Sequence, residues 1–290
     1  MIVFTSELCD QFKRDGCLAI PGFLTSDEVK EMRNEAQRLL DEFDIEGHPM
    51  TTFATEESPK GHVGDQYFLE SEDKVRYFLE EGAIGPDGRL TMSKEHAVNK
   101  IGHGLHDLIP VFAKASVNDR VRAIARALEY KDPMVLQSML IFKQPKIGGA
   151  VPCHQDSSFL YTDPPSALGF WFALEDCKTT NGCLEFVSRS HLITPITSRF
   201  VVKEGRTGTE FVPISDVKPP EPDPSEFKAI EVPAGTLVLI HGSVLHRSAP
   251  NLSDSSRYIY TFHIIEGTYK YDERNWLQPR TKPFTRLYTE

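Results

Sequence analysis

Two short stretches of the chain carry residues that could bind one metal ion together. The first is residues 151–160, in which His154 and Asp156 are two positions apart, and the second holds His246. If the first stretch is a strand, this spacing places both side chains on the same face. Two imidazoles and one carboxylate form the facial triad of non-haem Fe(II) oxygenases, which keeps further coordination positions open. The pattern therefore predicts an iron site that can accept a chelating cosubstrate and O2.

An arginine further along the chain supports a shared site. Arg257 follows His246 by eleven residues and opens the apolar run 258–265. A guanidinium group can bind a carboxylate through two parallel hydrogen bonds. A metal ion on one strand and an arginine on the next could therefore hold the two ends of one dicarboxylate. His-x-Asp alone is a weak motif, and the alternative is an unrelated buried histidine, exposed aspartate and surface arginine. The order of the three features favours the shared site.

These residues lie in a sequence that resembles a known family. His154-Gln-Asp156, His246-x-Ser248 and Arg257 are similar to the motifs of the phytanoyl-CoA dioxygenase (PhyH) family of Fe(II)/2-oxoglutarate-dependent oxygenases. Longer strings resemble one branch of that family, at residues 99–103, 137–139, 141–145, 251–254 and 275–279. The resemblance runs nearly from end to end of the chain, so it is more specific than a motif match.

The resemblance implies a metal and a reaction. Fe(II) would be bound by His154, Asp156 and His246, and the cosubstrate 2-oxoglutarate would chelate it through its 1-carboxylate and 2-oxo oxygens. The reaction would use O2 to convert 2-oxoglutarate into succinate and CO2 and to oxidise a C–H bond of a small organic substrate. The metal supplies this chemistry, and the protein positions the reactants and excludes water. Related halogenases lack the carboxylate ligand, so Asp156 favours hydroxylation.

The resemblance also implies a cosubstrate pocket. The distal carboxylate of 2-oxoglutarate would meet Arg257, with Ser248 as a hydroxyl donor. Ser248 lies two residues after the second histidine, so on an extended strand it faces the same way. Lys100, Met139 and Trp171 fall at positions that line this pocket in the same branch. The lysine could neutralise a carboxylate, whereas the other two supply apolar walls and one indole donor.

Two other classes of protein stay open at this point. A cupin-type protein could bind a metal at the same triad without oxygenase turnover. A zinc hydrolase would need a nearby carboxylate base, as in His-Glu-x-x-His, and the sequence has no such motif. Formation of succinate with Fe(II) separates all three classes. The substrate is not determined: an acyl-CoA, an amino acid, another metabolite or a natural product all remain open, although no obvious basic cluster is present for the phosphates of CoA.

Other residues near these motifs have simpler interpretations. His241 lies inside an apolar run, which favours a packed core residue over a metal ligand. His103 and His106 would share one face of a helix over 99–108, but they lack a third ligand. Phe159 follows the His-Gln-Asp motif and faces either the substrate or the core.

The composition limits the partners. The chain has 290 residues and a formal net charge of −10, which argues against nucleic-acid and anionic-membrane partners, because both bind a basic face. Five cysteines without zinc-ribbon spacing are expected to be reduced thiols. The sequence shows no secretory-type N-terminal segment, and its apolar runs are too short to span a bilayer. We expect a cytoplasmic protein that acts on a small-molecule substrate, with its oligomeric state left open.

The second half of the chain reads as a series of short strands. These are residues 134–143, 151–160, 167–174, 183–187, 227–232, 236–241 and 258–265. Turns rich in Gly, Pro and Asn separate them. We predict a mainly β fold with flanking α-helices: a double-stranded β-helix, which is jelly-roll and cupin-like, with N-terminal helices packed outside it. The prediction is one oxygenase domain over 1–290, with a helix-rich region over 1–133, a β-helix core at about 134–265 and a tail over 266–290.

The helix-rich region has its own local signals. A helix is predicted over 5–14, and a capping box at 25–28 starts a second one. A loop is predicted over 44–66, and a strand followed by a short helix over 67–81. In the second half, the Pro-rich stretch 203–226 is predicted to be either an active-site lid or a plain connection.

Overall fold

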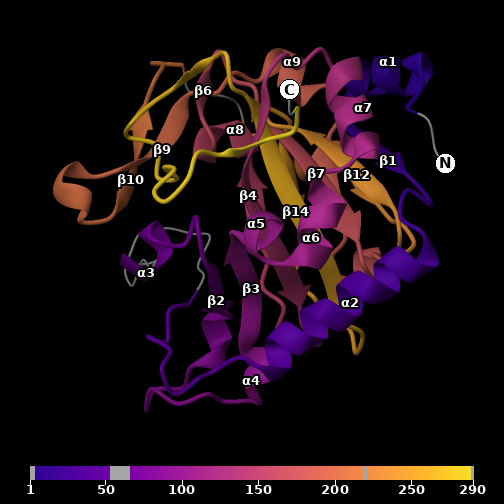
Figure 1. Ribbon diagram of the computed structural model, residues 1–290. Helices are drawn as coiled ribbons and strands as arrows, with labels where there is room; N and C mark the ends of the chain where they lie inside the picture. Colours follow the sequence, from indigo (N-terminus) through magenta and orange to yellow (C-terminus); the bar gives the residue numbers. More distant parts are fainter. Residues whose placement is uncertain (1–3, 53–65, 218–220, 289–290) are drawn as a thin grey trace.

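The computed structural model describes residues 4–52, 66–217 and 221–288. Most of its strands form two antiparallel sheets, here called the main sheet and the small sheet (Figure 1). The main sheet contains β1 (Cys17–Ile20), β2 (Val75–Leu79), β3 (Val98–His103), β4 (Pro133–Lys143), β7 (Leu168–Ala173), β12 (Leu237–His241), β14 (Arg257–Glu266) and β16 (Thr285–Arg286). The small sheet contains β5 (Val151–His154), β8 (Leu184–Val187), β11 (Phe227–Ile230) and β13 (His246–Ser248).

The remaining elements are helices and short hairpin strands. The α-helices are α1 (Ser6–Asp15), α2 (Ser26–Asp41), α3 (Gln66–Leu69), α4 (Lys94–Ala97), α5 (Leu105–Leu108), α6 (Pro110–Ser116), α7 (Asp119–Ala127), α8 (Asp156–Phe159) and α9 (Ser190–Ile193). The 3-10 helices are η1 (Glu81–Ala83), η2 (Thr179–Asn181), η3 (Glu204–Arg206) and η4 (Pro224–Glu226). The other strands are β6 (Thr162–Asp163), β9 (Ser198–Val202), β10 (Thr209–Pro213) and β15 (Lys270–Tyr271).

The strand order matches the predicted fold class. The main sheet has the order β1-β12-β7-β14-β4-β3-β2, with β16 paired to β4, and the small sheet has the order β11-β8-β13-β5. Each sheet therefore takes strands from distant regions of the chain, as the two sheets of a jelly roll do. The prediction of a mainly β fold, a double-stranded β-helix with flanking helices, is confirmed, and the two sheets are antiparallel. No helix in the described region of the chain is long and apolar enough to cross a membrane.

Local sequence signals account for the end of α1 and the start of α2. Thr25 and Glu28 form the predicted capping box at the start of α2, with each side chain bonded to the other residue's backbone N–H. Helix α1 ends at Gly16, which has a left-handed backbone with φ of 78°. The apolar stripe of α2 is buried, and Figure 1 shows this helix lying across the main sheet. The stripe therefore packs in the core.

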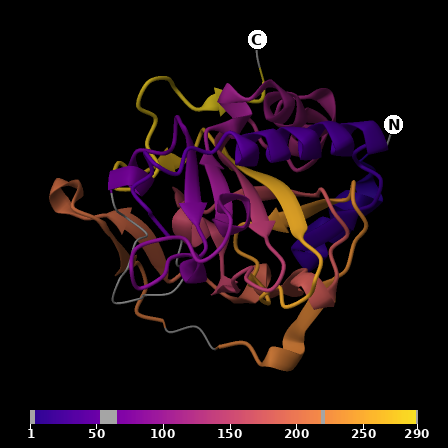
Figure 2. The same ribbon diagram turned by 90° about the horizontal axis from the view of Figure 1, so that it is seen from below.

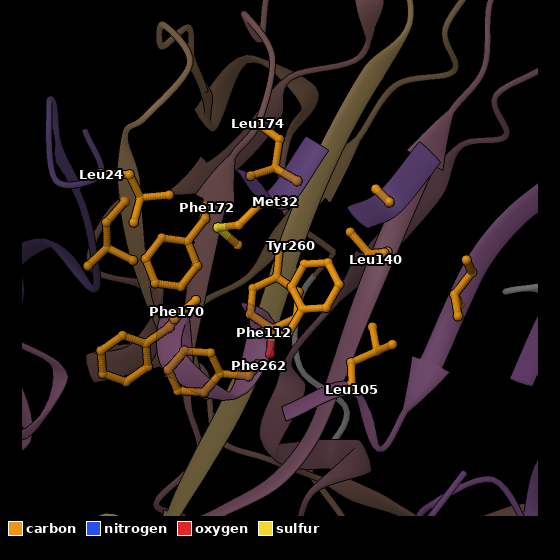
Figure 3. Close-up of a cluster of buried hydrophobic side chains, with 14 of the residues drawn as sticks. Leu24, Met32, Leu105, Phe112, Leu140, Phe170, Phe172, Leu174, Tyr260 and Phe262 are labelled. Atoms are coloured by element: carbon orange, nitrogen blue, oxygen red, sulfur yellow. The ribbon is translucent and has the colours of Figure 1, made fainter. Parts of the chain in front are cut away.

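Strand β14 runs through the middle of the main sheet, between β7 and β4. Tyr260 and Phe262 face the helices, where Figure 3 shows them in an aromatic cluster. The rings of Phe170 and Phe262 stack with centroids 4.7 Å apart, and those of Phe112 and Tyr260 stack at 4.6 Å. The Phe112–Tyr260 pair joins helix α6 to the main sheet, and the Phe170–Phe262 pair joins β7 to β14 within it, because stacked aromatic rings add to the free energy gained by burial.

The opposite face of the main sheet is its inner face, which packs against the small sheet. Trp171 of β7 and Ile259 of β14 belong to the same buried cluster as Leu184 of the small sheet. Alternation along β14 places Arg257, Thr261 and every second residue on this inner face. Strand β7 is covered on both faces, as its unbroken apolar sequence predicts.

Two segments of the helix-rich region differ from the prediction. Residues 67–81 contain the helix α3 first and the strand β2 after it, the reverse of the predicted order. Residues 99–108 begin as β3, which ends at His103, and only then form α5, so His103 and His106 do not share a helix. Strand β3 pairs with β2 on one side and β4 on the other. Such pairing overrides local propensity and cannot be read from the segment itself.

The less regular stretches join the fold at several points. Within 203–226, β10 pairs with β9 in a hairpin that projects from the rest of the molecule (Figures 1 and 2). The predicted tail adds β15 to β6 and β16 to the main sheet. Of the predicted loop 44–66, residues 53–65 lie outside the described residues.

The predicted strand 151–160 ends early. Strand β5 stops at His154, and Asp156 begins the short helix α8. The backbone N–H of Ser157 donates to the carbonyl of Gly242 at 2.8 Å, and the N–H of Gly242 donates to the carbonyl of Ala167 at 2.7 Å. The turn after β12 therefore holds the start of α8 through a backbone hydrogen bond. This long-range contact favours a helix where the local sequence predicts that the strand continues.

Replacing Gly242 with alanine should weaken this junction. A Cβ at Gly242 would lie 2.5 Å from the carbonyl oxygen of Ala167, so the backbone must shift. We expect the free energy of unfolding to fall by about 1–3 kcal/mol, as for other overpacked positions. The control is Gly82→Ala, where the nearest atom would be 3.8 Å away. Urea denaturation of the two variants should separate them, and equal stability would contradict the packing argument.

Candidate active site

His154, Asp156 and His246 come together at the meeting of β5, α8 and β13. One ligand atom from each lies within 4.8 Å of the other two. The Nε2 atoms of His154 and His246 are 3.5 Å and 3.6 Å from Oδ1 of Asp156. The two histidines are direct partners across the antiparallel pair β5–β13, which brings their ring centroids to 4.2 Å. The structure thus places three potential ligands around one point.

Asp156 reaches this point by a different route from the one predicted. Gln155 is extended, with φ of −122° and ψ of 125°, and Asp156 is the first residue of α8 rather than a strand residue. The amide of Gln155 donates to the carbonyls of Thr194 and Ser243 at 3.1 Å and 2.7 Å. These bonds fix the link between strand and helix, so that the carboxylate turns back towards the histidines.

The hydrogen bonds of both histidines leave the correct nitrogen free for a metal. Nδ1 of His154 lies 2.9 Å from the carbonyl oxygen of Pro152, and Nδ1 of His246 lies 3.0 Å from that of Val244. A carbonyl oxygen only accepts, so in the neutral ring each Nδ1 carries the proton and donates it. The lone pair of each Nε2 is then available to a metal placed between the two rings and Asp156, as in metal sites whose histidines are oriented by outer hydrogen bonds.

The electrostatics favour an ionised carboxylate at the centre of the cluster. Burial alone would raise the pKa of Asp156, but the nearby His246 and His263 and the hydrogen bond to His154 hold it well below its usual value. Burial lowers the pKa of His246 to about 4. For His154, burial lowers the pKa, but the hydrogen bond and charge of Asp156 outweigh it and raise the pKa overall. The cluster therefore centres on an ionised carboxylate, which is the form that binds metals.

Arg257 is the second buried charge of the site. It is only 3% exposed, at the start of β14, and its guanidinium lies 5.6 Å from the ring of Trp171. Burial lowers its pKa, against the opposing influence of Cys177, Cys183 and Glu175. Its Nε is buried without a hydrogen-bond partner, and the described residues supply no ion pair to the guanidinium. A buried cation without an acidic partner is costly, so the site is suited to an anion from outside.

Three of the predicted pocket residues, Lys100, Met139 and Trp171, lie near each other on the inner face of the main sheet, and Ser248 belongs to the small sheet. Thr261 on β14 is the register partner of both Met139 on β4 and Trp171 on β7, so these three residues are neighbours across adjacent strands. Nζ of Lys100 lies 3.8 Å from Sδ of Met139, and burial holds the pKa of this lysine well below its usual value. Ser248 is buried at the end of β13, two residues after the second histidine.

Lys143 connects the two sheets beside Arg257. It is the register partner of Arg257 across β4 and β14, and its Nζ donates to the carbonyls of Gly149 and Ala249 at 2.6 Å each. Burial lowers its pKa to about 7. Because Ala249 directly follows Ser248, these bonds hold the end of β13 against the corner of the main sheet that carries Arg257.

Sequence reasoning missed two polar residues on the inner face. His263 donates from Nε2 to Oδ2 of Asp156 at 3.2 Å, and Thr261 lies between two of the pocket residues. A signal for both was present, since they follow Arg257 along β14 at even spacing. Counting by two from the arginine through the apolar run would have placed them on its face.

The other candidate histidines lie outside the triad. His241 packs against His191, with ring centroids 4.7 Å apart, and its Nδ1 accepts a hydrogen bond from the backbone of Ser243 at 3.1 Å. His103 is bonded to Ser71, and His106 to Ser138. Among the residues that the structure describes, the triad is the one group of three or more that could hold a metal.

An aromatic group lies beside His154. The ring of Phe159 is 5.9 Å from the ring of His154 and about equally close to Phe200, at 5.4 Å, and Phe211, at 5.3 Å. Phe200 and Phe211 belong to the β9–β10 hairpin. Of the triad, His154 has the most exposed side chain, 24% against 11% for Asp156. His154 is therefore the most exposed member of the triad, and its ring lies beside that of Phe159.

Comparison with known proteins gives the family. The family described as Phytanoyl-CoA dioxygenase (PhyH) matches residues 12–259. The chain is 42% identical to "Phytanoyl-CoA dioxygenase domain-containing protein 1 homolog" of Caenorhabditis elegans, over 94% of this chain and 95% of that one. It is 44% identical to "Phytanoyl-CoA dioxygenase domain-containing protein 1" of Bos taurus, over 96% and 97%.

A solved structure agrees with the fold. The epimerase SnoN, in complex with Fe3+, alpha ketoglutarate and nogalamycin RO, superposes with a TM-score of 0.63 at 18% identity, covering 97% of this chain and 98% of SnoN. At that identity the likeness concerns the fold alone. The family match and the two relatives extend over most of the chain, and they agree with the branch that the longer strings resemble. The chain belongs to the phytanoyl-CoA dioxygenase family, and it is an oxidoreductase of the dioxygenase class.

Proposed function

We propose that this chain is an Fe(II)- and 2-oxoglutarate-dependent dioxygenase that oxidises a C–H bond of a small organic substrate. The observation that carries the proposal is Arg257, a buried guanidinium without an acidic partner among the described residues, between the same two sheets as the triad. A triad alone fits any metal-binding cupin. A triad with an unmatched buried cation fits a ligand that has a metal-chelating end and a distant carboxylate.

The triad residues fit iron by their donor chemistry. Two neutral imidazoles and one carboxylate are the ligands of non-haem Fe(II) sites. Iron bound by His154, Asp156 and His246 would supply the O2 chemistry that converts 2-oxoglutarate into succinate and CO2 and oxidises the substrate. The carboxylate supplies one negative charge to the metal, and each histidine is oriented by its own backbone carbonyl.

The chain's other residues bind the cosubstrate and exclude water. Arg257 would receive the distal carboxylate, and Ser248 would add a hydroxyl donor from the opposite sheet. Met139 and Trp171 are 8% and 6% exposed, so they close the space between the sheets to water. Low local polarity strengthens the attraction between the guanidinium and a carboxylate. Lys100, buried beside Met139, provides a second basic group in the same space.

The substrate approaches, in this proposal, on the side of His154. Phe159, Phe200 and Phe211 would then form an apolar wall next to the reacting carbon. Such a wall favours a hydrocarbon or aromatic portion of a substrate over a phosphate group, because burial of apolar surface is what aromatic walls offer.

The type of product that the oxidation forms does not follow from the metal and the cosubstrate alone. The retained carboxylate of Asp156 supports hydroxylation. A protein of similar fold, SnoN, is an epimerase, so the fold also accommodates other outcomes. Succinate is therefore the product to measure first, since it reports turnover whatever happens to the substrate. A protein that binds Fe(II) and 2-oxoglutarate but forms no succinate with any substrate would be a binding protein of the cupin type.

Removing any triad residue should abolish the iron site. We expect His154→Ala, Asp156→Ala and His246→Ala each to weaken Fe(II) binding by more than the ~10–100-fold that follows loss of an outer hydrogen-bond partner. Anaerobic titration with Fe(II) measures this. His241→Ala is the matched control, because it removes a buried histidine that packs against His191. Iron binding that survives in His246→Ala and is lost in His241→Ala would show that the wrong histidine has been chosen.

Removing the guanidinium should weaken 2-oxoglutarate binding and spare iron binding. Truncating one member of a buried charge pair costs about 2–5 kcal/mol, which is the loss expected for Arg257→Ala. Arg257→Lys should recover only a fraction of it, because an ammonium group cannot form two parallel hydrogen bonds to a carboxylate. The measurement is an anaerobic titration of 2-oxoglutarate into the Fe(II) protein, followed by the absorbance of the chelate. Unchanged affinity in Arg257→Ala would mean that another group, Lys100 first, holds the distal carboxylate.

A further inference from the structure

We infer that His263 is a positioning residue that restricts Asp156 to binding the metal through one oxygen. This inference rests on the proposed function. The two oxygens of the carboxylate have separate partners: Oδ1 faces Nε2 of His154 and of His246 at 3.5 Å and 3.6 Å. Oδ2 accepts a hydrogen bond from Nε2 of His263 at 3.2 Å. Only Oδ1 is therefore directed at the position that a metal would take between the ligands.

A second hydrogen bond sets the direction of the first. The amide of Gln137 donates to Nδ1 of His263 at 3.4 Å, and the two residues are register partners across β4 and β14. An ionised carboxylate only accepts, so Nε2 of His263 must carry the proton that faces Asp156. The neutral ring then presents Nδ1 as an acceptor, and Gln137 is the donor that matches it. Each of the two hydrogen bonds in the series Gln137–His263–Asp156 therefore has one defined donor and one defined acceptor.

A glycine on the neighbouring strand makes room for the ring. Gly169 of β7 is the register partner of His263 on the other side of β14. A Cβ at Gly169 would lie 3.3 Å from Nε2 of His263, closer than nine in ten real Cβ contacts. His263 is 6% exposed, so bulk water does not compete strongly for its hydrogen bonds. Gln137 on one strand and Gly169 on the other confine the ring. The pairing of these strands with β14 therefore sets the position from which His263 contacts Asp156.

The expected effect follows from the number of coordination positions. A carboxylate can bind a metal with one oxygen or with two. Bidentate 2-oxoglutarate and O2 need the three positions that a facial triad leaves open. An Asp156 released from His263 could turn and offer both oxygens, which would occupy one of those positions. We therefore place His263 outside the reaction itself, as the residue that keeps Asp156 a single-oxygen ligand.

The test measures metal and cosubstrate binding separately from turnover. His263→Leu removes the donor and keeps a side chain of similar bulk. Loss of an outer partner to a ligand typically lowers metal affinity ~10–100-fold, and we expect Fe(II) affinity to fall in that range. At saturating Fe(II), the affinity for 2-oxoglutarate should fall as well, because a two-oxygen Asp156 would occupy a position that the chelate needs. His263→Gln should restore most of it, because its amide N–H can replace the ring N–H. Gly169→Ala should cause a smaller loss, since it displaces the ring without removing a polar group.

A matched control separates positioning from packing. His106 is also a buried histidine, but it is bonded to Ser138 and lies away from the triad. His106→Leu should lower the unfolding temperature and leave Fe(II) affinity unchanged. Each variant is first checked for folding by its unfolding temperature. If folded His263→Leu binds Fe(II) and 2-oxoglutarate like the unaltered chain, or if His263→Gln is as impaired as His263→Leu, the inference is wrong.

The same titrations distinguish this inference from the proposed function. Fe(II) is titrated alone first, and 2-oxoglutarate is added afterwards. If the unaltered chain binds Fe(II) but forms no chelate with 2-oxoglutarate, the proposed function fails, while the Fe(II) affinities of the His263 variants still decide the role of that residue. If the unaltered chain binds no Fe(II), both are overturned.

Discussion

The free-energy cost of removing a charge from water governs this site. A charge buried between two sheets is tolerated only with hydrogen bonds or an opposite charge around it. Asp156 has both, because His154, His246 and His263 surround its two oxygens. The described residues give Arg257 no comparable partner. The fold thus surrounds the carboxylate of Asp156 with its own donors and supplies no opposite charge from the described residues to the guanidinium of Arg257. In the proposed function, the ligand supplies that charge.

The central strand of the main sheet carries stability and chemistry on alternate residues. On one face, Tyr260 stacks on Phe112 of helix α6 and Phe262 stacks on Phe170 of the neighbouring strand β7. Arg257 and His263, on the other face, interact with the site. Because a strand alternates strictly between its faces, a one-residue slip would exchange the two sets and destroy both. The precision of the site and the stability of the core therefore depend on the same strand register.

Residue type and order in the sequence pointed to the two histidines, the aspartate and Arg257, and the run of short strands predicted the fold. Local patterns could not reveal contacts between distant segments. Asp156 opens a helix because the turn at Gly242 binds the backbone of Ser157, far along the chain. Strand β3 exists because it pairs on both sides. His263 looked like one polar residue in an apolar run, and only the sheet register shows that it faces Asp156.

The order of strands in the main sheet has a consequence for how the protein is made. Strand β1 comes from the start of the chain, yet its partner is β12, more than two hundred residues later. The central strand β14 is synthesised later still. Pairings between such distant segments require large loops to close first, which slows folding. A ribosome-bound chain that has emerged only as far as Asp156 lacks both His246 and the strand that carries His263, so the proposed iron site cannot assemble until nearly all of the chain has emerged.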